Sequence, residues 1–159
     1  MPAQFDLDPQ VIERAFYDRS KDLHPDRFAN APAAERVVAL SQSRALNDAY
    51  KTLKNPVKRA EYLLAQAGVT IGPNEKLDPA FLMEILELRE ELAEARVANK
   101  LPEVSRLQRT MAERRKAAVA KLQPLFDHHD LPAIKDQLIL LRYLDRYLEE
   151  CDAALDEED

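Results

Sequence analysis

The tripeptide His24-Pro25-Asp26 places an imidazole, a rigid ring and a carboxylate in three consecutive positions. Proline fixes its own backbone φ angle and restricts the residue before it, so this loop is stiff and holds both polar side chains outward in a fixed relation. An ionised aspartate presented in this way is a good acceptor for an arginine of another protein. The alternative interpretation is an ordinary turn between two helices, in which Pro and Asp are common. The tripeptide alone does not decide between these interpretations.

Three basic residues, Arg14, Lys21 and Arg27, lie near this loop in the sequence. Arg14 and Lys21 are seven residues apart, which is about two helical turns, so a helix over this range places them on one face. The spacing predicts a basic helical face beside an exposed acid.

The segment Asp127-His128-His129-Asp130 contains the residue types that bind metal ions. Adjacent histidines rarely point at one ion, and this segment lies between Pro124 and Pro132, so we interpret it as a polar loop between helices. The sequence also lacks a nucleophile–base pair, a phosphate-binding glycine loop and a second cysteine beside Cys151. We therefore predict no metal, no cofactor and no enzymatic activity, and a metal-dependent enzyme using His128 and His129 is the last alternative.

The charge balance of the 159 residues, 23 Lys+Arg against 29 Asp+Glu, gives a net charge of −6. Binding to nucleic acid or to an anionic membrane needs a surplus of basic residues, so neither partner is expected. No apolar run is long enough to span a bilayer, and the N-terminus has neither the basic start nor the apolar run of a secretory signal. With a lone cysteine, these features predict a reducing, cytoplasmic setting.

Helix-forming residues dominate the composition, only 2 Gly occur, and no segment alternates with period two, so the chain is predicted to be all-α. Prolines following an N-cap residue mark several helix starts. The predicted helices cover approximately residues 9–23, 33–54, 57–67, 79–99, 102–122 and 132–151. Short connections between the last three favour an antiparallel three-helix bundle.

Both glycines lie in residues 68–78, GVTIGPNEKLD, which we interpret as a linker. Residues 1–67 carry a net charge of +1 and residues 68–159 a net charge of −7. The difference in charge suggests two modules with different partners, residues 1–67 and residues 79–159.

The order helix, His-Pro-Asp, helix, followed by ALNDAYKTLKNPVKRAEYLL, resembles the J-domain of DnaJ-type co-chaperones. Beyond the linker, AFLMEILELREELAEA and LLRYLDRYLEE are similar to the HscB (Jac-type) family of iron–sulfur cluster assembly. The resemblance covers nearly the whole chain. It implies a J-domain that stimulates the ATPase of an HscA/DnaK-type heat-shock chaperone, and a C-terminal three-helix module that delivers an IscU-type scaffold to that chaperone.

The resemblance also implies site residues. His24, Pro25 and Asp26 fall on the chaperone-stimulating triad, with Arg14, Lys21 and Arg27 beside it. The positions that the family uses to hold the scaffold are Leu82, Met83, Leu86, Glu87, Glu90 and Tyr143, of which the last is more often Phe in the family. Two alternatives stay open: a J-domain protein with a different client, and a non-catalytic helical adaptor whose His-Pro-Asp loop has no function.

The helical pattern supports a scaffold-binding surface independently. The tight apolar stripe that would seat the helix against a bundle is Phe81, Ile85, Leu88 and Leu92. Leu82 and Leu86 lie about 100° to one side of this stripe, and Met83, Glu87 and Glu90 lie further round. In the last helix, Ile139 and Tyr143 fall off the predicted core stripe. The apolar arc is wider than one packing face needs, although a helix that touches two neighbours also needs a wide arc.

Two features depart from the family. J-domains usually begin with a short helix that bears Phe or Tyr and Leu, whereas this sequence starts at the following segment. We therefore expect either that the true start lies upstream or that the J-domain hairpin lacks its first helix. Arg19 lies near the apolar face of its helix, where the family more often has an aliphatic residue. Both features predict a less rigid J-domain. The sequence shows no cysteine-rich N-terminal extension, which favours a bacterial, cytoplasmic form.

Overall fold

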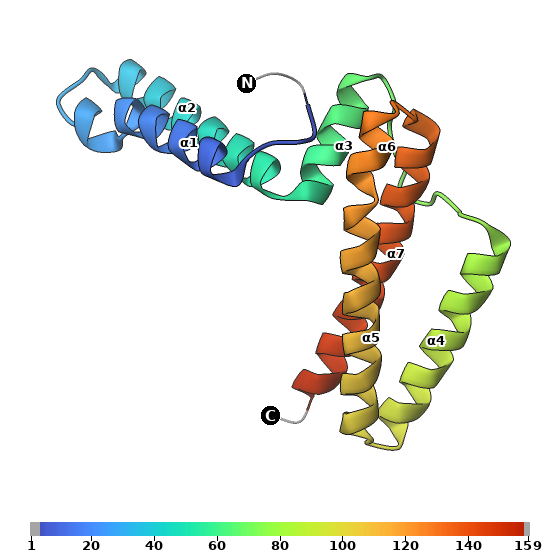
Figure 1. Cartoon of the computed structure of the whole chain (residues 1–159). Helices are drawn as coiled ribbons and strands as arrows, with labels where there is room; N and C mark the ends of the chain where they lie inside the picture. The colour runs from blue at the N-terminus through green and yellow to red at the C-terminus, as the bar shows by residue number, and fades with distance from the viewer. Residues whose placement is uncertain (1–3, 158–159) are drawn as a thin grey trace. The chain divides into compact units, whose positions relative to one another are not determined.

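The computed structural model describes residues 4–157, which form helices and no strand, and this confirms the all-α prediction (Figure 1). The chain divides into two compact units, Met1–Gln66 and Ala67–Asp159. Each unit is described by itself below.

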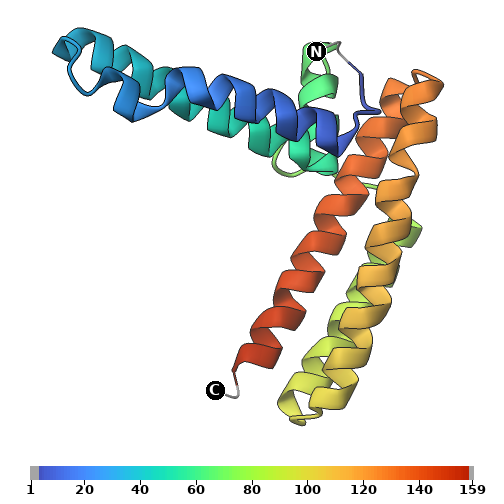
Figure 2. The same ribbon diagram turned by 60° about the vertical axis from the view of Figure 1, so that its left-hand side comes forward.

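The first unit is built around two antiparallel helices, α1 (Pro9–Leu23) and α2 (Ala33–Lys54), joined through the short 3₁₀ helix η1 (Pro25–Phe28) (Figures 1 and 2). Asp8 caps α1 by accepting a hydrogen bond from the Gln10 backbone N–H at 2.9 Å. The third helix, α3 (Pro56–Gln66), begins directly after Asn55, whose side-chain oxygen accepts from the N–H groups of Val57 and Lys58. The His-Pro-Asp loop therefore lies at the turn of a helical hairpin.

The contact between α1 and α2 uses one side of α2. Ala39 is buried, whereas Val38, Ala45 and Ala49 are exposed. Positions 39, 43, 46, 50 and 53 repeat every three to four residues and form the less exposed side of α2. Opposite them, the ring of Phe16 stacks on that of Tyr50 with centroids 4.2 Å apart. The two aromatic rings set the register of the hairpin.

The second unit is the predicted antiparallel bundle of α4 (Pro79–Val97), α5 (Leu101–Ala120) and α7 (Leu131–Asp156), with a short additional helix α6 (Leu122–Asp127) (Figures 1 and 2). Positive φ angles at Asn99 and His129 end α4 and α6. The fully buried side chains of this second unit include Val104, Leu107, Met111, Leu122, Ile134, Leu138, Leu141, Leu144, Tyr147 and Cys151. Most of them come from α5 and α7, so this pair forms the centre of the core.

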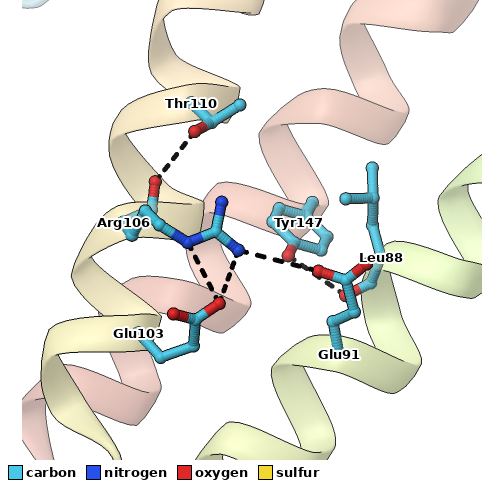
Figure 3. Close-up of polar contacts among 6 residues, drawn as sticks. All are labelled: Leu88, Glu91, Glu103, Arg106, Thr110 and Tyr147. Atoms are coloured by element: carbon cyan, nitrogen blue, oxygen red, sulfur yellow. Dashed lines mark hydrogen bonds and ion pairs between the residues drawn. The ribbon is translucent and has the colours of Figure 1, made fainter.

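A polar cluster fixes α4 against the other two helices (Figure 3). The hydroxyl of Tyr147 on α7 donates a hydrogen bond to the backbone carbonyl of Leu88 on α4 at 3.1 Å. Arg106 on α5 contacts Glu103 on its own helix and Glu91 on α4, the latter at 3.8 Å. Burial raises the pKa of the Tyr147 phenol, so this hydroxyl stays protonated and remains a donor.

Candidate functional site

The His-Pro-Asp loop presents its carboxylate to solvent. His24 ends α1 in an extended conformation and starts η1, because Pro25 cannot continue the hydrogen-bond ladder of α1. The side chain of Asp26 is 92% exposed and that of His24 is 60% exposed. The loop therefore offers both polar groups to an external partner.

The imidazole holds the loop in shape. The Nδ1 atom of His24 accepts a hydrogen bond from the backbone N–H of Asp26 at 3.2 Å. The Asp26 carboxylate lies 3.6 Å from the same Nδ1 atom. Because the Asp26 side chain is 92% exposed, its carboxylate remains available to an external cation.

The predicted basic residues around the loop are all exposed. Arg27 binds the carboxylate of Asp22 at 3.3 Å across the turn. Arg14 and Lys21 lie on α1, and within residues 4–157 neither has an ion-pair partner. Exposed charges attract an oppositely charged surface at long range more than they stabilise the fold.

The second group of predicted residues lies on α4. The core stripe is buried as predicted at Phe81, Ile85 and Leu92, and Ile85 is 2% exposed. Leu86 and Met83 are 55% and 59% exposed, and Leu82 is partly buried. Large apolar side chains that remain this exposed on one helix are candidates for a partner-binding surface.

The sides of α4 are identified by its ion pairs. Arg89 binds Glu150 and Arg96 binds Glu157, so the side of α4 that carries them faces α7. Leu82 is seven residues before Arg89 and therefore shares this side, with Leu86 further from the core. Tyr143 on α7 lies at the same junction, because its ring is edge-on to that of Phe81 at a centroid distance of 5.9 Å.

Tyr143 is held in place from two directions. Its ring contacts Phe81, and its hydroxyl donates a hydrogen bond to the backbone carbonyl of Glu75 at 3.3 Å. The side chain is half-buried, not fully exposed. We define the partner surface as Leu82, Met83, Leu86 and Tyr143.

Two acids border this surface on α4. Glu87 and Glu90 are exposed, and neither has an ion-pair partner among the described residues. Glu84, by contrast, is bound through both its oxygens by Arg114 of α5, and this guanidinium lowers the pKa of the Glu84 carboxyl. The structure thus separates acids that hold the bundle together from acids that are open to a partner.

The segment before α4 covers part of α7, which the sequence did not predict. Ile139, predicted to lie off the core, is only 3% exposed. Arg142 donates to the backbone carbonyl of Gly72 at 3.0 Å, and Lys135 binds the Glu75 carboxylate at 2.9 Å. Residues 72–76 therefore pack on α7 and do not form a free linker there.

Sequence reasoning also missed Lys76, Arg142 and Arg146, which line a hollow beside Tyr143. The available signal was the pair of arginines four residues apart on α7, on the same helical face.

The described residues give no support for a metal site at Asp127-His128-His129-Asp130. Within residues 4–157, no three His, Cys, Asp or Glu side chains gather closely enough to hold a metal ion. Asp127, His128 and His129 are exposed, and Asp130 caps α7 by accepting from the Ala133 N–H. No helix in the described range is long and apolar enough to cross a membrane.

Comparison with known families divides the chain as the two units do. Residues 4–62 match the DnaJ domain, and residues 77–152 match the HSCB C-terminal oligomerisation domain. A helical hairpin with an exposed His-Pro-Asp loop, matched to the DnaJ domain, defines a J-domain protein.

Similar proteins identify the family. The chain is 35% identical to a co-chaperone protein HscB homolog of Burkholderia thailandensis, over 98% of this chain and 90% of the relative. It is also 35% identical to a homolog of Neisseria meningitidis, over 95% of this chain and 92% of the relative. The chain belongs to the HscB family of J-domain co-chaperones, which function in iron–sulfur cluster assembly.

Solved structures agree with this assignment. The chaperone HscB from Vibrio cholerae superposes with a TM-score of 0.82 and 34% identity, covering 99% of this chain and 94% of that one. Human co-chaperone HscB superposes with a TM-score of 0.86 and 27% identity, covering 96% of this chain and 77% of that one.

Proposed function

We propose that His24-Pro25-Asp26 is the contact through which this co-chaperone stimulates the ATPase of an HscA/DnaK-type chaperone. The observation that carries the proposal is the Asp26 carboxylate, 92% exposed and held beside the His24 imidazole at a rigid turn. An arginine of the chaperone would form a charge-assisted hydrogen bond with it. Arg14, Lys21 and Arg27 would orient the approaching chaperone by long-range attraction.

The partner surface would hold an IscU-type scaffold protein. Leu86 and Met83 provide exposed apolar area, and Leu82 and the fixed ring of Tyr143 extend it across the junction of α4 and α7. Glu87 and Glu90 form a charged rim, and such rims mainly steer encounter while a few apolar anchors supply most of the affinity. In this proposal, residues 1–67 act on the chaperone, residues 79–159 hold the scaffold, and residues 68–78 connect them. The bacterial sources of the similar co-chaperones support a cytoplasmic location.

The loop is tested by Asp26→Asn, which preserves shape and removes the charge. Losing a charge-assisted contact at an interface costs on the order of 2–5 kcal/mol, so ATPase stimulation should be lost while scaffold binding is retained. Asp18→Asn, which removes an exposed charge from α1 outside the loop, is the matched control and should stimulate normally. Normal stimulation by Asp26→Asn would refute the role of the loop.

The surface is tested by the double variant Met83→Ala, Leu86→Ala. Titration with an IscU-type scaffold should show affinity reduced at least tenfold, because exposed apolar anchors near the centre of an interface dominate its energy. ATPase stimulation in the absence of scaffold should be unchanged. Undiminished scaffold affinity would remove this surface from the proposal.

A further inference from the structure

A hollow of about 200 Å³ opens beside Tyr143, between residues 72–76 and α7. Its basic lining residues are Lys76, Arg142 and Arg146, and its acidic lining residue is Glu75. The hollow lies entirely within the second unit and shares Tyr143 with the partner surface.

The charges in this hollow are unequally engaged. Glu75 is bound by Lys135 and by the backbone N–H of Gly72, and the bond with Lys135 is the larger cause of the lowered pKa of its carboxyl. Arg142 donates to the Gly72 carbonyl and so holds the segment against α7. With Glu75 already paired, the lining has an excess of positive charge.

Arg146 and Lys76 are the cations available to a partner. Both are exposed, and neither has a carboxylate partner within residues 4–157. The guanidinium of Arg146 lies 6.0 Å from the centroid of the Tyr143 ring, so it is placed at the edge of the partner surface. A planar guanidinium with several N–H donors binds a carboxylate through paired hydrogen bonds.

We propose that this hollow binds an acidic side chain of the scaffold and that it fixes the direction in which the scaffold segment lies across the partner surface. The inference rests on the proposed scaffold-binding function. Arg146 and Lys76 border the surface at its Tyr143 side, whereas Glu87 and Glu90 border it on α4, where Glu87 lies about 100° beyond Leu86. An apolar scaffold segment with an acidic side chain toward α7 and a basic side chain toward α4 places opposite charges against both rims of the partner surface. The same segment lying in the reverse direction places like charges against both rims, which is unfavourable.

The first experiment titrates an apo IscU-type scaffold into the full chain and its variants at low and high salt. Arg146→Gln and Lys76→Gln should each weaken binding about five- to tenfold, and the loss should shrink at high salt because ion pairs near the surface are screened. Arg109→Gln, at an exposed arginine of α5, is the matched control and should bind like the wild type. Melting curves should show that Arg146→Gln folds normally.

The outcomes separate this inference from the function on which it rests. If Leu86→Ala weakens binding while Arg146→Gln and Lys76→Gln bind like the wild type, the acid-binding hollow is refuted and the scaffold surface stands. If Arg109→Gln weakens binding as much as Arg146→Gln, the effect is one of net charge and the hollow is also refuted. A wild-type chain that does not bind the scaffold refutes both.

The second experiment tests the direction. Arg146→Glu should weaken binding more than tenfold, and reversing one scaffold acid to lysine should restore it. The same scaffold variant should not restore binding to Glu87→Lys. Equal rescue of both variants would show that charge does not set the direction and would overturn that part of the inference.

Discussion

The ring of Tyr143 on α7 lies edge-on against the ring of Phe81 on α4, with their centroids 5.9 Å apart and their planes at 79°. Phe81 is buried and Tyr143 is half-buried, so the same contact seats α4 in the bundle and supports the partner surface. Because the Tyr143 hydroxyl also binds the Glu75 carbonyl, the aromatic ring is fixed before any partner arrives. Such prior ordering reduces the entropy lost on binding.

Tyr143→Phe tests the role of that hydroxyl. The variant keeps the ring contact and loses the hydrogen bond to Glu75, so its free energy of unfolding should fall by about 0.5–1.5 kcal/mol. Tyr143→Ala should cost more, since it also removes half-buried aromatic area and the edge-on contact. Denaturant unfolding of the two variants gives both values, and equal costs would show that the ring contributes no packing energy.

Leu86 and its neighbour Ile85 provide a second test. Ile85 is 2% exposed and Leu86 is 55% exposed, so truncation to alanine should lower the stability of the bundle at Ile85 and leave it nearly unchanged at Leu86. Ile85→Ala should destabilise the bundle by about 2–5 kcal/mol, whereas Leu86→Ala should change stability by less than about 0.5 kcal/mol. Thermal melts of the pair measure this directly, and an early melt of Leu86→Ala would place Leu86 in the core.

Much of this architecture could be predicted from local sequence rules. The pairs Asp8-Pro9 and Asp78-Pro79 each begin a helix at the predicted residue, because the aspartate accepts a backbone N–H and proline has none to lose. The stripe from Phe81 to Leu92 was also correctly predicted, since a spacing of three to four residues is a local property of the helix.

The covering of α7 could not be predicted in this way. Residues 72–76 contain Gly, Pro and Asn, so their composition indicates a linker. Their packing depends on bonds to Arg142 and Tyr143, which are separated from them by 70 and 68 residues along the chain. Helical periodicity contains no information about such distant contacts, and for this reason the burial of Ile139 and the basic hollow were missed.

Hydrogen exchange should distinguish the two units. Between residues 4 and 55, the buried side chains are Phe5, Ile12 and Ala39, whereas the bundle buries large side chains along most of α5 and α7. Amides of α1 and α2 should therefore exchange faster than those of α5 and α7, because few buried apolar contacts oppose local opening. Mass spectrometry of peptides after brief deuteration measures this, and uniform protection in both units would contradict the prediction.

Cys151 offers a chemical probe of the bundle core. Burial raises the pKa of its thiol to about 11 from an ordinary value of 9.0. This rise in the pKa from 9.0 to about 11 lowers the thiolate fraction at pH 8 about a hundredfold. A thiol reagent should therefore label the native chain at least that much more slowly than the unfolded chain. The single cysteine makes the signal unambiguous.

The same shift has a defined sign for stability. The folded state favours the protonated thiol, so this contribution to stability is complete below about pH 9 and is lost as the pH rises toward 11. In the labelling experiment, rapid reaction of Cys151 in the native chain at pH 8 would contradict its burial and show that the end of α7 opens readily.

The central claim, that one chain acts on the chaperone through Asp26 and carries the scaffold on α4 and α7, is tested most directly by the ATPase rate of an HscA-type chaperone with both proteins present. Tethering raises the effective concentration of the scaffold at the chaperone, so the rate with co-chaperone and scaffold together should exceed the sum of the two separate stimulations. Met83→Ala with Leu86→Ala should remove only this excess, and Asp26→Asn should remove it together with the stimulation by the co-chaperone alone. Additive rates for the wild type, or an excess that survives both sets of changes, would contradict the account.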